Sequence, residues 1–139
     1  MTVDLTEYKQ KLANINVLLV EDDEINQEVA MDILDDIDLK PVLVENGQLA
    51  VDVLNQNHGT DDAFDIILMD LQMPVMDGIT ATKLIRDEAR HQDLPIIALT
   101  AHAQNQHEEE CLSAGMNGFV SKPFDSQNLF QTLITHCVS

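Results

Sequence analysis

The stretch IILMDLQMPVMDGI, residues 66–79, begins with four apolar residues and then places Asp70 where the apolar run stops. Pro74, Asp77 and Gly78, all turn-forming residues, follow within the same stretch. A short apolar run bounded by such residues predicts a buried β-strand followed by a loop. A carboxylate at the end of a buried strand needs a reason, which makes Asp70 the first candidate functional residue.

Four other apolar runs alternate with helical patterns on either side of this stretch. The expected strands cover residues 17–20, 41–44, 64–69, 96–99 and 118–121, and the expected helices cover 24–37, 47–56, 79–90, 103–115 and 126–137. Near-continuous apolar strands separated by helices predict a parallel sheet covered on both faces, because parallel strands need crossover connections and helices supply them. The expected fold class is therefore α/β, with a doubly wound, five-stranded parallel sheet.

The chain has 139 residues, of which 45% are hydrophobic, and fits one domain with one core. Residues 1–15 are polar and predict an N-terminal tail, linker or short helix, followed by the domain at residues 16–139. No apolar run approaches the ~20 residues of a membrane span and no signal peptide is recognisable, so we expect a cytoplasmic protein. Cys111 and Cys137 lack the spacing of a zinc site or a disulfide framework and are expected to be core residues.

The charge of the chain is strongly negative, with 7 Lys and Arg against 25 Asp and Glu and a formal net charge of -18. Such a chain repels phosphate backbones and anionic membrane surfaces. We therefore expect no direct binding to nucleic acid and no insertion into a membrane.

Polar residues follow four of the five expected strands. In doubly wound sheets the ligand site lies beyond the carboxyl ends of the strands, so these residues are expected to meet. Each alone has an ordinary explanation, such as a helix cap or a solvated charge. The residues are Glu21, Asp22 and Asp23 after the first strand, Asp70 after the third, Thr100 after the fourth and Lys122 after the fifth.

Taken together, these residues predict a magnesium-dependent reaction at phosphorus. Two unit charges ~4 Å apart repel by about 4 kcal/mol at an effective dielectric constant near 20, so converging carboxylates favour a bound cation. Mg²⁺ suits one or two carboxylates, whereas Ca²⁺ wants a denser oxygen cage. A carboxylate beside such an ion is a nucleophile for phosphorus, which makes Asp70 the candidate nucleophile. Thr100 then supplies a hydroxyl donor, and Lys122 supplies a positive charge.

The sequence resembles the receiver domain of two-component response regulators, most closely the receivers of hybrid sensor histidine kinases. The resemblance covers about residues 16–136 and is carried by LLVEDDEINQ, ILMDLQMPVMDG, ALTA and SKPF, in that order. It implies the flavodoxin-like strand order 2-1-3-4-5. It also implies a module that catalyses its own phosphoryl transfer and slow dephosphorylation while acting as a signalling switch.

Residue by residue, the resemblance implies that Asp70 accepts a phosphoryl group from the phosphohistidine of a histidine kinase or a histidine phosphotransfer protein. It implies that Glu21, Asp22, Asp70 and the backbone carbonyl of Gln72 hold Mg²⁺. Asp23 stands where similar domains often have Asn. We expect Asp23 to cap the following helix, with a contribution to ion affinity as the alternative.

The resemblance assigns further roles near the fourth and fifth strands. Thr100 and Lys122 are expected to contact the phosphoryl group. Phe119 occupies the position of an aromatic residue that turns inward when Thr100 moves, although an ordinary buried strand residue is an equal alternative. The Lys122–Pro123 bond corresponds to the cis peptide of the family.

The histidines do not form a metal site or a phosphohistidine site by their spacing. Most are expected at the surface, and His102, two positions beyond Thr100, is interpreted as an exposed loop residue rather than a modulator of hydrolysis. The five histidines are His58, His91, His102, His107 and His136.

Two other functions compete with the switch. An aspartyl-phosphate phosphatase would use the same residue types, but such enzymes carry a D-x-D pattern after the first strand, and here Leu71 and Gln72 follow Asp70. A scaffold that binds its partner regardless of phosphorylation would not need every acidic, hydroxyl and ammonium group. The chain is expected to be either a stand-alone regulator or, slightly favoured, part of a hybrid sensor kinase.

Overall fold

The computed structural model describes residues 5–57, 59, 63–71, 75–88, 91–100, 105–122 and 124–137. Strands and helices alternate from β1 onward, as the sequence predicts. The elements are α1 (Leu5–Lys11), β1 (Val17–Val20), α2 (Glu24–Asp35), β2 (Val42–Val44), α3 (Gly47–Asn57), β3 (Ile66–Asp70), α4 (Gly78–Asp87), β4 (Ile96–Thr100), α5 (Asn105–Ala114), β5 (Gly118–Ser121) and α6 (Ser126–Cys137).

The strands form one five-stranded sheet in the order β2-β1-β3-β4-β5, and every pairing is parallel. This confirms the predicted fold class and strand order. Parallel pairing brings the carboxyl ends of the strands to one edge of the sheet. In the observed register Val20 lies opposite Met69, and Asp70 lies opposite Leu99.

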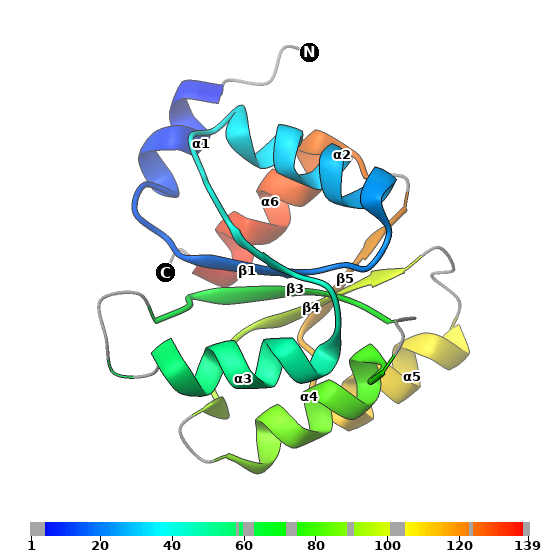
Figure 1. Ribbon diagram of the computed structural model, residues 1–139. Coiled ribbons are helices and arrows are strands. Elements are labelled where there is room, and N and C mark those ends of the chain that lie inside the picture. Colours follow the sequence, from blue (N-terminus) through cyan, green and yellow to red (C-terminus); the bar gives the residue numbers. More distant parts are fainter. Residues whose placement is uncertain are drawn as a thin grey trace.

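Helices cover both faces of the sheet, with α1, α2 and α6 on one face and α3, α4 and α5 on the other (Figure 1). Side chains alternate between the faces along each strand, so every central strand contributes to two separate cores. The core under α2 and α6 takes Val17, Leu19, Ile66, Leu68, Ile97, Leu99 and Val120 from the strands. The core under α3, α4 and α5 takes Leu18, Val20, Ile67, Met69, Ile96 and Ala98.

Burial is complete in the central strands and incomplete at the edge strand β2. All residues of β1, β3 and β4 are buried, as their continuous apolar runs predict. In β2, however, Val42 is 43% exposed and Leu43 is 36% exposed. An edge strand has a neighbour on one side only, so its apolar run does not imply burial on both faces.

Helix α1 packs on the core rather than standing apart from it. The rings of Tyr8 and Phe130 lie 5.1 Å apart between centroids, and Leu12, just beyond the helix, has no exposed surface. An ion pair of 3.8 Å joins Lys9 to Asp38 after α2. Residues 5–12 therefore cover apolar surface of the core under α2 and α6.

Both cysteines are free thiols. Cys111 is fully buried in α5, as expected for a core residue, and Cys137 is half-buried at the end of α6. None of the helices in the described ranges has the length and apolar character needed to cross a membrane.

Truncating Leu12 tests whether α1 and its junction are part of the stable fold. Because Leu12 is fully buried, Leu12→Ala is expected to lower the free energy of unfolding by about 2–4 kcal/mol in a urea titration. Leu5→Ala is the matched control, since Leu5 is 37% exposed at the start of α1 and its truncation is expected to cost under about 1 kcal/mol. Equal effects of the two substitutions would contradict the observed packing.

Candidate functional site

Three charged side chains converge at the carboxyl edge of the sheet because they share one strand face. Asp70 ends β3, Glu21 follows β1 directly and Lys122 follows β5 directly. Side chains alternate along a strand, so a residue two positions further on faces the same side. The three lie two positions after residues of the core under α2 and α6, namely Leu19, Leu68 and Val120.

Lys122 pairs with both carboxylates at this edge. Its Nζ lies 2.7 Å from Glu21 Oε1 and 3.2 Å from Asp70 Oδ1. The side chain of Glu21 has no exposed surface, that of Asp70 is 8% exposed and that of Lys122 is 14% exposed. Buried charges are stable only when they are paired, so each of the three side chains depends on the others.

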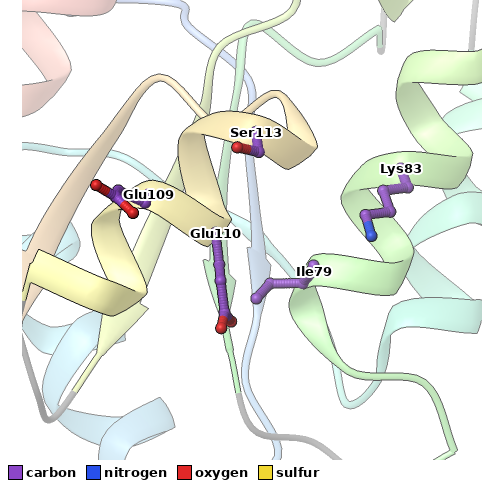
Figure 2. A pocket seen from close by; sticks show the side chains of 5 residues that line it. All are labelled: Ile79, Lys83, Glu109, Glu110 and Ser113. Carbon is purple, nitrogen blue, oxygen red and sulfur yellow. The ribbon is translucent and has the colours of Figure 1, made fainter.

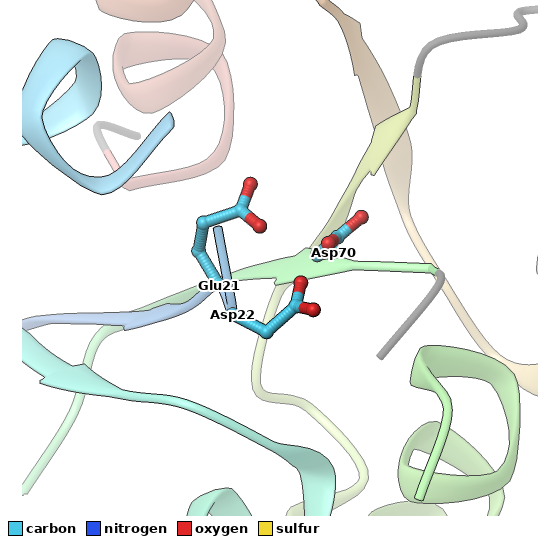
Figure 3. A group of neighbouring side chains, drawn as sticks. All are labelled: Glu21, Asp22 and Asp70. Carbon is cyan, nitrogen blue, oxygen red and sulfur yellow. The ribbon is translucent and has the colours of Figure 1, made fainter. Parts of the chain in front are cut away.

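Asp22 brings a third carboxylate to the group. One carboxylate oxygen from each of Glu21, Asp22 and Asp70 lies within 4.8 Å of the others. Figure 3 shows the three side chains gathered where β1 and β3 end. Asp22 is exposed, so the group is open to solvent on one side. Carboxylate oxygens with an open side fit a hard divalent cation such as Mg²⁺, which retains several waters when bound.

Asp23 caps α2, as expected. Its Oδ1 accepts a hydrogen bond from the backbone N–H of Ile25 at 3.3 Å, and its Oδ2 accepts one from Asn26 Nδ2 at 2.9 Å. Gln27 Nε2 donates to the carbonyl oxygen of Glu21 at 2.7 Å. The first turn of α2 therefore fixes the segment that carries Glu21.

Thr100 and Phe119 lie on the two strands beyond Asp70. Thr100 is 7% exposed at the end of β4, and its carbonyl oxygen accepts a hydrogen bond of 2.8 Å from the N–H of Lys122. Phe119 is half-buried in β5 against the core under α3, α4 and α5. Movement of Phe119 with Thr100 stays a prediction.

The protonation of the site is set by burial and by its own charges. The pKa of Asp70 is raised to about 7, because burial and the neighbouring Glu21 raise it more than Lys122 lowers it. For Lys122, burial acts to lower the pKa, but the hydrogen bonds and negative charges of Glu21 and Asp70 outweigh burial and raise it. Asp70 thus exchanges its proton near neutral pH beside a lysine that stays charged.

Gly78 allows α4 to begin directly against the site. Its N–H donates to the carbonyl oxygen of Leu71 at 3.0 Å. A Cβ atom at Gly78 would collide with the backbone carbonyl oxygen of Asp70. Packing therefore requires glycine at position 78. The sequence indicates Gly78 only as a turn-forming residue.

His91 departs from the expectation that most histidines are exposed. It is 5% exposed, its carbonyl oxygen accepts a hydrogen bond of 2.6 Å from Arg86 Nη1, and its Nε2 lies 3.4 Å from Asn55 Oδ1. His136 is half-buried in α6. His91 contacts both α3, through Asn55, and α4, through Arg86. The spacing of the histidines in the sequence does not predict these contacts.

Several expected features lie outside the described residues. These are the carbonyl of Gln72, the Lys122–Pro123 peptide bond, His58, His102 and the side chain of His107.

Comparison with known proteins identifies what the chain is similar to. A family model described as the response regulator receiver domain matches residues 17–134. The chain is 49% identical over 120 residues to hybrid signal transduction histidine kinase M of Dictyostelium discoideum, covering 84% of this chain and 5% of that protein. It is 37% identical over 127 residues to the osmosensing histidine protein kinase SLN1 of Saccharomyces cerevisiae, covering 91% of this chain and 10% of that protein. The chain thus spans a small part of these relatives.

Two solved structures share the fold of this chain and are 38% and 32% identical to it in sequence. One is the receiver domain of a sensor histidine kinase from Pseudomonas aeruginosa with a magnesium ion coordinated in its active site cleft, at a TM-score of 0.81 and 38% identity, covering 91% of this chain and 100% of that one. The other is the complex of the Saccharomyces cerevisiae histidine phosphotransfer protein Ypd1 with the receiver domain of its downstream response regulator Ssk1, at a TM-score of 0.79 and 32% identity, covering 88% of both chains.

The raised pKa of Asp70 predicts how stability depends on pH when divalent ions are removed. The folded state holds its proton up to a pKa of about 7, whereas the ordinary value is 3.8, so the free energy of unfolding falls as pH rises between these values. Asp70→Asn is therefore expected to stabilise the chain by about 1–3 kcal/mol at pH 8, since one pKa unit corresponds to about 1.4 kcal/mol. The gain should vanish near pH 4.

Urea unfolding in EDTA at several pH values measures this difference. Asp32→Asn is the matched control, because Asp32 is exposed on α2 and its loss is expected to change little. A gain from Asp70→Asn that is absent at pH 8, or equally large at pH 4, would contradict the assigned cause.

Proposed function

The chain belongs to the response regulator receiver domain family, and we propose that it accepts a phosphoryl group on Asp70 and thereby switches a protein-interaction surface. The observation that carries this proposal is the contact of Lys122 with both Glu21 and Asp70, beside the exposed carboxylate of Asp22. This arrangement combines a nucleophile, a cation ligand set and a positive charge at the open edge of the sheet.

In the proposed reaction, a carboxylate oxygen of Asp70 attacks the phosphorus atom of a phosphohistidine. A P–O bond to Asp70 forms while the P–N bond breaks, and the electron pair of the P–N bond stays on the imidazole nitrogen that leaves. Asp70 must be ionised to attack, and its pKa of about 7 places this requirement near neutral pH.

Glu21, Asp22 and Asp70 are the proposed magnesium ligands, together with the carbonyl of Gln72 expected from the sequence. The bound ion would offset the negative charge of the phosphoryl oxygens. The chemistry of the donor set supports this choice, since all three side chains offer hard oxygen atoms from two strands. The magnesium-bound receiver of Pseudomonas aeruginosa, at 38% identity, supports it further.

Lys122 and Thr100 are the proposed partners of the phosphoryl oxygens. Lys122 already contacts Asp70 Oδ1 at 3.2 Å, and its flexible stem allows the ammonium to follow the added group. Thr100 ends the neighbouring strand and offers a hydroxyl donor. Phosphorylation adds roughly -1.5 to -2 charges, and we propose that Thr100 and Phe119 pass this change to α5 and β5.

The proposed donor is a histidine kinase or a histidine phosphotransfer protein. The complex of Ypd1 with a receiver domain supports this class of partner. In this chain α2 begins beside the site and exposes apolar side chains, with Ile25 70% exposed and Val29 39% exposed one turn later. Exposed apolar residues beside a reactive group are typical of a protein docking surface.

The alternatives of a phosphatase and of a scaffold that ignores phosphorylation gain no specific support from the site. We also propose that the chain acts as the receiver of a hybrid sensor kinase, with residues 1–15 as the lead-in to the domain at 16–139. Similarity to parts of such kinases supports this arrangement. The cytoplasmic location expected from the sequence stays a prediction.

Incubation with acetyl phosphate and Mg²⁺ tests the acceptor. Intact mass spectrometry is expected to show the gain of one phosphoryl group in the wild type and none in Asp70→Asn, because Glu21, the other carboxylate in contact with Lys122, has no exposed side-chain surface for a phosphoryl donor to reach. Asp77→Asn is the matched control. Asp77 caps α4 through the N–H of Thr80 at 2.8 Å, and Asn preserves such a cap. A wild type without a magnesium-dependent mass gain would contradict the proposal.

Substitution of Ile25 tests the donor surface. Transfer from phosphorylated yeast Ypd1 to Ile25→Ser is expected to slow by about tenfold, since a buried apolar contact of about 1.4 kcal/mol is lost. Uptake from acetyl phosphate should not change, because Ile25 does not contact Asp70. Leu112→Ser serves as control, since Leu112 is 57% exposed on α5. Equal slowing with both donors would show damage to the site instead of a docking surface.

A further inference from the structure

Arg86 joins three segments on the α3, α4 and α5 side of the sheet through one guanidinium group. Its Nε donates to the carbonyl oxygen of Gly115 at 2.9 Å, its Nη1 to the carbonyl oxygen of His91 at 2.6 Å and its Nη2 to Asn117 Oδ1 at 2.8 Å. Arg86 lies in the last turn of α4, Gly115 follows α5 directly and Asn117 precedes β5 directly. The side chain therefore anchors the C-terminal end of α5.

Two neighbours strengthen this anchor. Asn117 Oδ1 also accepts a hydrogen bond from the N–H of Ile96 at 3.0 Å, and the N–H of Asn117 donates to the carbonyl oxygen of Ile96 at 2.8 Å. Gly115 has φ +110°, and a Cβ atom there would lie 2.7 Å from Arg86 Cγ. The anchor is thus tied to the start of β4 and depends on glycine at the end of α5.

The other end of α4 rests on the site. Gly78, its first residue, lies so close to Asp70 that a side chain at Gly78 would meet the carbonyl oxygen of Asp70. The ten-residue helix α4 therefore has polar contacts at both ends, from Gly78 to Leu71 beside the site and from Arg86 to Gly115. Contacts at both ends hold α4 in place, so the helix forms a fixed support for Gly115 through Arg86.

A groove lies between α5 and α4. It has a volume of about 650 Å³ and is lined by Ile79, Lys83, Glu109, Glu110 and Ser113 (Figure 2). Only Cys111 and Ala114 are buried among residues 109–114 of α5. Residues 109–114 of α5 thus have little buried surface, while the C-terminal end of the helix is held by Arg86.

From these observations we infer that Arg86 is a positioning residue for the switch: it fixes the C-terminal end of α5, so that the state of Asp70 moves the body of α5 about that point. The inference deepens the proposed function and rests on it. When Asp70 is phosphorylated, we expect the backbone to change at residues 109–114 of α5 and to stay unchanged from Gly115 onward.

Hydrogen exchange in Mg²⁺ with and without beryllofluoride, a phosphoryl mimic, tests the inference. In the wild type, exchange rates of residues 109–114 are expected to change by about threefold or more, and those of 115–117 by less than about 1.5-fold. In Arg86→Met the change is expected to spread to 115–117. Arg86→Lys, which keeps the charge but not the three-way fork, should give a smaller spread.

Lys40→Met is the control, because Lys40 is an exposed cation outside the groove between α4 and α5 and forms no ion pair with any residue in the described ranges. It should reproduce the wild-type pattern. A wild-type pattern in both Arg86 variants would overturn the inference, and so would a wild type in which 115–117 change as much as 109–114. Should Arg86→Met fail to fold, Arg86→Lys decides alone.

Phosphoryl uptake from acetyl phosphate, measured on the same samples, distinguishes a failure of the role of Arg86 from a failure of the phosphoacceptor function. Uptake at Asp70 without any change in α5 would overturn the role of Arg86 and leave the phosphoacceptor function standing. No uptake would overturn both.

Discussion

Lys122 stabilises a group of acidic side chains that would otherwise repel one another. Its ammonium lies between Glu21 and Asp70, at 2.7 Å and 3.2 Å, where almost no water reaches the two carboxylates. Three carboxylates meet one ammonium group, so not every negative charge is paired. Burial and the neighbouring Glu21 raise the pKa of Asp70 to about 7. This imbalance favours a further positive charge at the site and places the titration of Asp70 near neutral pH.

The surrounding fold attaches several elements to this charged site. Helix α2 begins beside Glu21, with Asp23 as its cap, and helix α4 begins against the carbonyl of Asp70. The ends of β4 and β5 are joined by the hydrogen bond from Lys122 to the Thr100 carbonyl. A change of charge at Asp70 would therefore act next to the starts of α2 and α4 and the ends of β4 and β5. Among residues 109–114 of α5, the part of that helix whose side chains are described, only Cys111 and Ala114 are buried.

Apolar continuity allowed the parallel sheet and its carboxyl edge to be predicted from the sequence, whereas the strand order came from the resemblance to receiver domains. The period of two also explains why Glu21, Asp70 and Lys122 meet, since all three continue the face of Leu19, Leu68 and Val120. These patterns do not predict the contacts that helices and loops make with segments far away in the sequence. The burial of His91 and the three hydrogen bonds of Arg86 depend on how α4 sits against the start of β5. The exposure of β2 depends on which strand lies at the edge, which apolar content alone does not reveal.

Proton release on binding Mg²⁺ measures the charge imbalance at Asp70 most directly. Calorimetric titration of Mg²⁺ in buffers of different ionisation enthalpy gives the number of protons released per ion. With the pKa of Asp70 at about 7, the account predicts release of nearly one proton at about pH 6 and very little at about pH 8, with affinity rising across this interval. Binding that releases no proton at either pH, with an affinity independent of pH, would contradict the account.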